Sequence, residues 1–299
     1  MIQRRDYMVR ATALDGLVRA FAIDSTATVG ELRRRHVTDP AVTAALGRLA
    51  TGTLLLGAML KDEDQLVTVR VQGNGPAGTL LASANGGGEV RGLVSNPRPD
   101  VEQVNERGKL NVSGVVGTEG RLTVTRDLGM RQPHTSTVEI VSGEVGEDLA
   151  HFLATSEQIP SAVGIGVFVQ ATGDVEAAGG YIVQLMPGIT DAQASRIESV
   201  IRDLPHPTTM LRDGDNPERM LNRIFDNDLQ ILANTPVRFH CPCSKERAER
   251  ALMLLGRDEL KSLIEADADK GATEVVCQFC TAEYRITIVE LERLLNSLN

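Results

Sequence analysis

Tryptophan is absent from this chain of 299 residues, and aromatic residues make up only 3% of it. Its hydrophobic core must therefore be built from aliphatic side chains, mainly valine, leucine, isoleucine and alanine. Cysteine is equally absent from residues 1–240, and all four cysteines lie near the C-terminus. Thiol chemistry and metal binding through sulfur are therefore confined to the last part of the chain.

A long uncharged hydrophobic run is also missing. The first 16 residues contain no apolar stretch long enough for a signal peptide. The most hydrophobic stretch, 41–60, carries Arg48 and is rich in threonine and glycine, so we expect a buried helix and no membrane partner. These features predict a cytoplasmic protein. In a reducing compartment, paired cysteines more often hold metal or do redox work than form structural disulfides.

The chain also has no excess of positive charge. The net charge is −9, and residues 238–299 contain nine lysines and arginines against eleven aspartates and glutamates. A protein that neutralises nucleic-acid phosphates usually presents a basic face. We therefore expect no nucleic-acid partner.

Residues 1–187 predict an α+β domain with a mainly antiparallel sheet. Asp15-Gly16 between two apolar runs is typical of a hairpin, and Asp39 followed by Pro40 predicts the start of a long helix. A helix is also expected over about 147–158. Strand-like runs occur at 66–72, 79–85, 89–95, 121–127, 135–142, 163–170 and 179–186.

Catalytic and nucleotide-binding patterns are weak in this domain. The segment GNGPAG at 73–78 matches the glycine spacing of dinucleotide-binding loops, but such a loop must open a helix, and here strand-like residues 79–85 follow. A tight turn between antiparallel strands is the better interpretation. His36, His134 and His151 stand alone, without a Ser/His/Asp or paired-carboxylate pattern, so we expect that the protein is not an enzyme.

Residues 188–237 predict a charged, amphipathic, helical linker. Its apolar residues at helical spacing are Ile189, Ile197, Val200, Ile201, Leu204, Met220, Leu221, Ile224 and Phe225. In one interpretation this stripe simply packs on the first domain. In the other, the linker is a docked element that can detach and expose the stripe. The pattern by itself favours simple packing.

Residues 238–299 hold the two cysteine pairs, Cys241-Pro-Cys243 and Cys277-Gln-Phe-Cys280. Four sulfurs brought together can fill the tetrahedral coordination of one zinc ion and leave no position for water, so a structural zinc site is expected. The same four sulfurs could instead form two disulfides. His240 could compete as a ligand, but we expect it to be a neighbour of the site.

Apolar residues are few in this last segment, and its small core is expected around Leu252, Leu255, Leu263, Ile264 and Val276. Bound zinc contributes on the order of 10 kcal/mol or more to the folding of such small modules. A disulfide within the Cys-Pro-Cys pair would close a small, strained ring, and strained disulfides are the labile, regulatory kind. Oxidation that removes zinc would therefore unfold the module.

Two functions of other classes stay open from the residues alone. A zinc-ribbon protein that binds nucleic acid would have this cysteine pattern, although it would usually carry a basic face. A thiol–disulfide oxidoreductase would also have paired cysteines, but its reactive pair usually lies at the start of a helix. Residues 277–280 lie between strand-like segments instead.

Beyond these patterns, the chain resembles the heat-shock protein 33 family of redox-regulated holdase chaperones. The resemblance covers nearly the whole chain and rests on the two cysteine pairs and on the stretches at 73–92, 142–170 and 181–188. It implies that the reduced, inactive protein binds one zinc ion. The implied ligands are Cys241, Cys243, Cys277 and Cys280. It further implies that oxidants and unfolding conditions together form the disulfides Cys241–Cys243 and Cys277–Cys280 and release zinc.

The resemblance also implies that the zinc module and linker then unfold, and that the protein, often as a homodimer, holds unfolding client proteins without ATP. The expected organisation is an α+β chaperone domain over 1–187, the linker over 188–237 and a zinc-binding redox switch over 238–299. The linker becomes the candidate moving part. The residues expected to meet clients are Ile197, Val200, Ile201, Met220, Leu221, Ile224 and Phe225.

Overall fold

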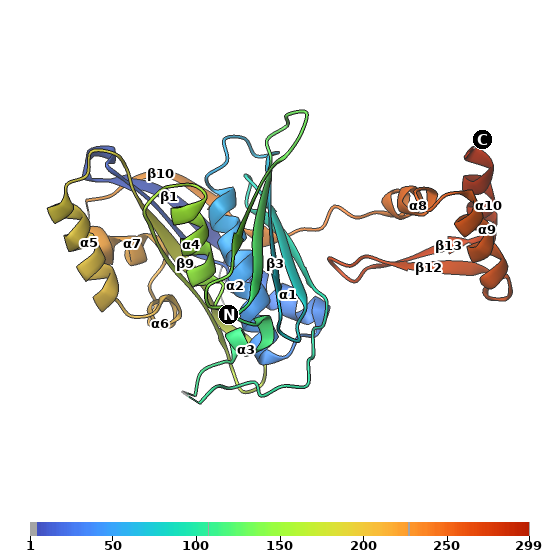
Figure 1. The fold of residues 1–299 in the computed structure, drawn as a ribbon, viewed down its shortest axis with the longest axis horizontal. Coiled ribbons are helices and arrows are strands. Elements are labelled where there is room, and N and C mark those ends of the chain that lie inside the picture. Colours follow the sequence, from blue (N-terminus) through green and yellow to red (C-terminus); the bar gives the residue numbers. More distant parts are fainter. Residues whose placement is uncertain (1–4, 107, 227, 299) are drawn as a thin grey trace. The chain divides into compact units, whose positions relative to one another are not determined.

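Two compact units make up the part of the chain that the structure describes, residues 5–106, 108–226 and 228–298. In this computed structural model they are Met1–His240, which we call the core unit, and Cys241–Asn299, which we call the cysteine unit. The fold is α+β with antiparallel sheets, as predicted (Figure 1). The predicted strand-like runs are all strands in the structure.

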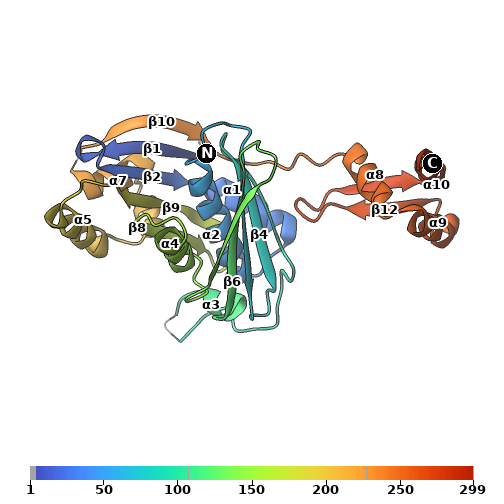
Figure 2. The same cartoon turned by 45° about the horizontal axis from the view of Figure 1, so that its top comes forward.

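The first sheet of the core unit, sheet A, has the strand order β10-β1-β2-β9-β8, with every neighbouring pair antiparallel (Figure 2). Its strands are β1 (Tyr7–Ala13), β2 (Val18–Asp24), β8 (Ser161–Val169), β9 (Val175–Leu185) and β10 (Gln230–Pro236). The predicted hairpin joins β1 to β2 through a turn at Leu14–Gly16, in which Asp15 has a positive φ of 51°. Asp-Gly suits this turn because both residue types tolerate the left-handed region.

The second sheet, sheet B, has the order β11-β5-β4-β3-β6-β7 and is antiparallel except for the short β11–β5 pairing. Its strands are β3 (Leu66–Gly73), β4 (Thr79–Asn85), β5 (Glu89–Val94), β6 (Gly120–Asp127), β7 (His134–Glu139) and β11 (Arg238–Phe239). The glycine-rich segment at 73–78 is the turn between β3 and β4, so the prediction of a turn in place of a nucleotide-binding loop is confirmed.

Helix α2 (Pro40–Gly57) lies between the two sheets and is the centre of the core. It begins after Asp39 as predicted, and its side chains are buried along almost its whole length. Gly52 allows the close packing, because a Cβ at this position would lie 2.3 Å from Leu149 Cδ1. Arg48 is the charged exception, and it pairs with Glu144 at 2.5 Å. The remaining helices around this core are α1 (Thr26–His36), α3 (Val112–Val116) and α4 (Gly146–Thr155).

Three short helices of the linker cover the other face of sheet A: α5 (Asp191–Asp203), α6 (Pro207–Arg212) and α7 (Pro217–Phe225). Figure 1 shows the resulting layers of the core unit, with α5 and α7 on one side of sheet A and α2 on the other. The prediction of a helical linker up to residue 237 is wrong for its last part. Residues 230–236 form the strand β10, because they extend sheet A by pairing with β1.

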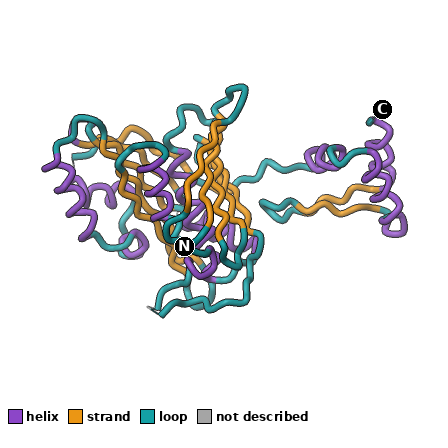
Figure 3. Tube along the Cα trace, viewed as in Figure 1, coloured by secondary structure: helices purple, strands orange, loops and turns teal. Residues whose placement is uncertain are grey.

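The described residues of the cysteine unit form one hairpin, three α-helices and a short 3-10 helix at Ala268–Lys270. Figure 3 shows the hairpin in orange and the helices in purple. The elements of the unit are α8 (Lys245–Met253), α9 (Arg257–Ala266), β12 (Ala272–Val276), β13 (Glu283–Thr287) and α10 (Ile288–Ser297). A capping box starts α10, because Thr287 accepts a hydrogen bond from the backbone of Glu290 and the Glu290 carboxylate accepts one in return. In the described part of both units, no helix is long and apolar enough to span a membrane.

Candidate functional site: a four-thiol metal centre

The second cysteine pair lies at the turn of the β12–β13 hairpin. Strand pairing places Val276 opposite Glu283, so residues 277–282 form the turn. The backbone N–H of Cys277 donates to Ala282 O at 2.9 Å, and that of Thr281 donates to Cys277 O at 2.8 Å. Thr281 has a positive φ of 58°, which turns the chain back into β13. These bonds make a tight loop that holds both thiols at one end of the hairpin.

The first cysteine pair lies in an extended segment directly before α8. Ser244 is the N-cap of this helix, and its hydroxyl accepts a hydrogen bond from the backbone N–H of Arg247 at 3.3 Å. The cap fixes where the helix begins, and it therefore fixes the position of Cys243 one residue earlier. The restricted φ of Pro242 limits the possible directions of Cys241 relative to Cys243.

The structure brings all four predicted thiols together, with their sulfur atoms within 4.8 Å of one another. The distances are 3.8 Å between Cys241 Sγ and Cys277 Sγ and 3.2 Å between Cys243 Sγ and Cys280 Sγ. A zinc–sulfur bond of about 2.3 Å places the sulfurs of a tetrahedral site about 3.8 Å apart. All four cysteines are in the reduced, thiol form. The cluster therefore has the dimensions of a closed four-coordinate metal site.

His240, the residue that could have competed as a ligand, is not part of this cluster. It belongs to the core unit, where its backbone N–H donates to Val90 O at 2.9 Å. The metal-binding group among the described residues consists of the four cysteines. Four soft thiolate ligands suit zinc, and a site filled by protein ligands has no open position for water. The arrangement can therefore bind a metal ion that holds the fold together.

The environment of the thiols differs from one sulfur to the next. Burial raises the pKa of Cys280 and of Cys241, which favours the protonated thiol. Burial also acts to raise the pKa of Cys243, but the hydrogen bonds donated by the Tyr284 hydroxyl and the neighbouring thiols outweigh it and lower the pKa to about 7. The hydroxyl donates to Cys243 Sγ at 3.0 Å, and this bond raises the pKa of Tyr284 to about 12. Negative charge in the cluster therefore collects on Cys243.

The apolar core of the cysteine unit is small. Five apolar side chains are buried together among its described residues: Leu252, Leu260, Ile286, Leu291 and Leu294. Of the predicted core residues, Leu263 and Ile264 pack against this cluster, whereas Leu255 and Val276 are exposed by 49% and 45%. Such a core leaves little apolar burial to offset chain entropy, and the four-thiol site can add a link between the segment before α8 and the β12–β13 turn.

All the predicted client-binding residues of the linker except Val200 belong to, or pack against, the apolar cluster between the linker helices and sheet A. Ile197, Met220, Leu221, Ile224 and Phe225 are buried, and Val200 and Ile201 are half-buried. The face of sheet A beneath the linker is itself apolar. It consists of Val9, Ala11, Ala13, Val18, Ala20, Ala22, Ala177, Tyr181 and Val183. Detachment of the linker helices would expose both surfaces.

Polar contacts at two points also join the linker to the sheet. The Tyr7 hydroxyl donates to Glu218 Oε2 of α7 at 2.7 Å. Arg212 of α6 donates to Glu176 Oε1 of β9 at 2.8 Å, and its guanidinium lies 4.0 Å from the centre of the Phe168 ring. These contacts are few and largely exposed, so apolar packing carries most of the docking.

A segment that the sequence analysis missed connects the linker to the cysteines. Within 230–239, β10 pairs with β1 of sheet A and β11 pairs with β5 of sheet B. Arg238 donates to Glu89 Oε1, with Nη2 at 2.5 Å, and Phe239 lies under the guanidinium of Arg35 at 4.6 Å. Every residue of β10 is exposed or half-buried, so the alternation that identifies a strand in a sequence is lacking. We call 238–239 with its partners the clasp.

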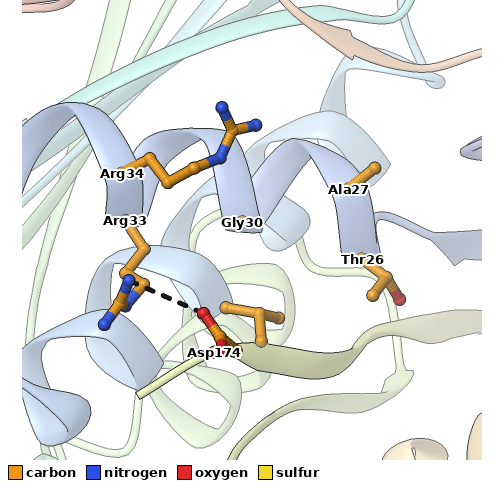
Figure 4. A pocket seen from close by; sticks show the side chains of 7 residues that line it. Thr26, Ala27, Gly30, Arg33, Arg34 and Asp174 are labelled. Atoms are coloured by element: carbon orange, nitrogen blue, oxygen red, sulfur yellow. Dashed lines mark ion pairs between the residues drawn. The ribbon is translucent and has the colours of Figure 1, made fainter. Parts of the chain in front are cut away.

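A surface pocket elsewhere in the core unit, of about 370 Å³, lies beside α1 and the start of β9 (Figure 4). Arg33 pairs across it with Asp174 at 3.8 Å, and Arg34 pairs with Glu31. Both guanidinium groups therefore already have acidic partners. The pocket therefore gives no second candidate for a catalytic or ligand-binding site in addition to the thiol centre.

Comparison with known proteins agrees with this geometry. A family model described as "Hsp33 protein" matches residues 6–287. The 33 kDa chaperonin of Bacillus subtilis is 48% identical over 97% of this chain and 98% of its own length, and that of Enterococcus faecalis is 46% identical over 97% and 96%. The crystal structure of the 33 kDa chaperonin (heat shock protein 33 homolog) of Thermotoga maritima matches with a TM-score of 0.90 and 35% identity, covering 98% of this chain and 99% of that one. The chain therefore belongs to the Hsp33 family and has a chaperone role.

Proposed function

We propose that this protein is a redox-regulated, ATP-independent holdase of the cytoplasm that binds unfolding proteins and prevents their aggregation under oxidative stress. The observation that carries the proposal is the four-thiol cluster, with all sulfurs within 4.8 Å, in a unit that buries only a small apolar core. The covered apolar face of sheet A supports it, because a holdase needs an apolar surface that can be hidden and exposed.

In the resting protein, the thiolates of Cys241, Cys243, Cys277 and Cys280 would hold one zinc ion. When bound, zinc would join the segment before α8 to the β12–β13 turn and supply folding free energy on the order of 10 kcal/mol or more. The linker helices stay packed on sheet A, and the client-binding surface is covered. The protein is then inactive as a chaperone.

In the active protein, Cys241 and Cys243 form one disulfide, and Cys277 and Cys280 form the other. Hydrogen peroxide can be the oxidant for each pair. One thiolate attacks the peroxide oxygen to give a sulfenic acid and hydroxide, and the second thiolate attacks that sulfur and displaces another hydroxide. Each disulfide thus uses two thiolates and one peroxide, which takes up the two electrons. The sulfurs then no longer provide four thiolate ligands.

The unfolding would spread from the cysteine unit to the linker along the chain. Cys241 lies two residues after the end of β11, so the chain that leaves the clasp leads at once into the cysteine unit. When the cysteine unit unfolds, this weak attachment loses its folded neighbour. Helices α6 and α7 are too short to persist without their packing partners. The domain division at 1–187, 188–237 and 238–299 is proposed for this change, in which the linker unfolds while the α+β domain persists.

Release of the linker would present its stripe, Ile197, Val200, Ile201, Met220, Leu221, Ile224 and Phe225, together with the apolar face of sheet A. Such a surface suits unfolded clients because apolar contact does not depend on client sequence. We further propose that the active form is a homodimer, that it neither catalyses a reaction nor binds nucleic acid, and that binding of clients is its whole activity. The net charge of −9 is consistent with the exclusion of nucleic acid.

The decisive experiment follows zinc release and suppression of client aggregation in the same samples, with and without peroxide at raised temperature. The proposal expects the reduced protein to hold one zinc ion and suppress little aggregation, and the oxidised protein to lose zinc and suppress aggregation together. Full suppression while zinc stays bound would contradict the switch. Turnover of a disulfide substrate, or salt-dependent binding of DNA or RNA, would favour the two alternative functions.

A further inference from the structure

One tyrosine makes a direct contact with the thiol cluster. Tyr284 lies on β13, paired across the hairpin with Val275, and its hydroxyl donates a hydrogen bond to Cys243 Sγ at 3.0 Å. Its ring is half-buried and packs on the apolar cluster around Ile286 and Leu260. Strand pairing and ring packing therefore both hold the hydroxyl on this sulfur.

The contact makes the two sulfurs of the first pair chemically different. Cys241 Sγ lies 3.8 Å from Cys277 Sγ, whereas Cys243 Sγ lies 3.2 Å from Cys280 Sγ and also accepts the phenolic hydrogen bond. A hydrogen bond to a thiolate ligand takes up electron density on sulfur, as other outer contacts of metal ligands do. A sulfur with less available electron density attacks a peroxide oxygen more slowly.

We propose that Tyr284 slows the direct attack of the Cys243 thiolate on peroxide and thereby sets the order of oxidation within the Cys-Pro-Cys pair. Cys241 reacts first: its thiolate attacks the peroxide O–O bond, which breaks to give the Cys241 sulfenic acid and one hydroxide. Cys243 is the resolving sulfur: its thiolate attacks Cys241 Sγ, the disulfide forms and a second hydroxide leaves. Tyr284 is thus a positioning residue of the redox site. This inference rests on the proposed function, because it assumes that the thiolates hold zinc in the resting protein.

The test compares the wild-type protein with Tyr284→Phe, which removes the hydroxyl and keeps the ring in the apolar cluster. Zinc-loaded full-length protein is treated briefly with substoichiometric hydrogen peroxide in the presence of dimedone, which traps sulfenic acids. Mass spectrometry then gives the ratio of trapped Cys243 to trapped Cys241. Both sulfurs lie in one peptide, so a general loosening of the unit would raise the dimedone labelling of both cysteines and leave the ratio unchanged. Ser262→Ala removes a hydroxyl from an exposed position of α9 in the same unit and serves as the control.

The expected result is label mainly on Cys241 in the wild type and in Ser262→Ala, and a rise of at least about threefold in the Cys243/Cys241 ratio in Tyr284→Phe. An unchanged ratio would overturn the inference, and so would a lower one, which would mean that the phenol assists oxidation of Cys243. The zinc content of the wild type, measured before peroxide is added, tests the proposed function separately. A protein without zinc would overturn both, whereas a zinc-bound protein with an unchanged ratio would overturn this inference alone.

Discussion

The core unit and the cysteine unit are stabilised in different ways, although both belong to one chain. The core unit buries two large apolar clusters, one on each face of sheet A, and the first of these extends through α2 to sheet B. The described part of the cysteine unit has one cluster of five buried apolar side chains, and its four thiols lie within 4.8 Å of one another with Cys280 buried and the other three half-buried. Apolar burial does not respond to oxidants, whereas thiolate ligands do. The redox-sensitive and redox-insensitive parts of this protein are therefore separated along the sequence.

A second comparison lies within the core unit, between the two faces of sheet A. The face toward α2 presents large side chains such as Phe21 and Ile23, whereas the face toward the linker presents many alanines, including Ala11, Ala20 and Ala22. Burial of a small side chain removes less apolar area from water and so contributes less free energy. Apolar packing therefore holds the linker on sheet A less strongly than it holds α2. The linker is also the part that must detach in the proposed activation.

The largest effect is expected from removal of one thiol. Cys280 is 4% exposed and central to the cluster, so Cys280→Ser should abolish tight metal binding and unfold the cysteine unit, with a loss on the order of 10 kcal/mol. The core unit should keep its own thermal transition. Amide exchange and thermal unfolding of the full chain check both statements, with the exposed Ser262→Ala as the control. A cysteine unit that stays folded without the thiol would remove the contrast between the two units.

A charge placed beneath the linker should have the next largest effect. Leu221 is completely buried between α7 and sheet A, and Leu221→Asp should weaken linker docking by about 3 kcal/mol or more. We expect this variant to suppress client aggregation while zinc is still bound. Ser199→Asp introduces the same group at an exposed position of α5 and should remain inactive until oxidised. If both variants behaved like the wild type, the covered face would not be the client surface.

Loosening of the clasp should give a moderate effect. Phe239→Ala removes the cation–π contact with Arg35, worth about 0.5–1 kcal/mol, and Arg238→Ala removes an exposed ion pair worth about 0.2–1 kcal/mol. The double variant should raise amide exchange in β10 and β11 several-fold and shift activation to lower temperature in peroxide. Arg121→Ala removes an equally exposed guanidinium from another ion pair on sheet B and is the control. Activation at the wild-type temperature would show that the clasp does not restrain the linker.

The smallest effect is a pH-dependent one at the ion pair between α6 and β9. Hydrogen bonds donated first by Arg212 and then by Gln170 lower the pKa of Glu176 from 4.5. The folded state therefore favours the ionised carboxylate, so its contribution to docking is present above pH 4.5 and is lost as the pH falls below that value. Glu176→Gln should slightly increase amide exchange of α6 at pH 7, and this difference from the wild type should shrink on acidification. A difference that persists unchanged at low pH would assign the effect to packing. Glu139→Gln, on β7 of sheet B, is the control.

Much of the fold could be predicted from residue patterns, because the patterns reflect local physics. The alternation in β3 to β9, the Asp15-Gly16 turn and the start of α2 after Asp39 are visible in the sequence, since each depends on neighbouring residues. The strand β10 could not be predicted in this way. Its seven residues bury little and form a strand only because β1 offers an unpaired edge, which is a tertiary contact.

The candidate site shows the same division between local and tertiary information. The spacing of the two cysteine pairs predicted that four thiols would meet, and the sulfur distances agree with it. The hydrogen bond from Tyr284 to Cys243 was not predictable, because the two residues lie 41 positions apart and meet only through the β12–β13 hairpin. The docking of the linker lies between these cases. Its apolar stripe is visible in the sequence, but the alanine-rich face that receives it is assembled from β1, β2 and β9.

In the proposed switch, loss of the metal centre releases the linker from sheet A. Hydrogen exchange of α5, α6 and α7, measured in the reduced zinc-bound protein and after peroxide at raised temperature, tests it most directly. We expect the backbone amides of Met220, Leu221 and Ile224 to be strongly protected in the reduced state. After oxidation they should lose that protection while α2 stays protected. Equal protection of 189–232 in both states, in a protein that has lost zinc and suppresses aggregation, would contradict it.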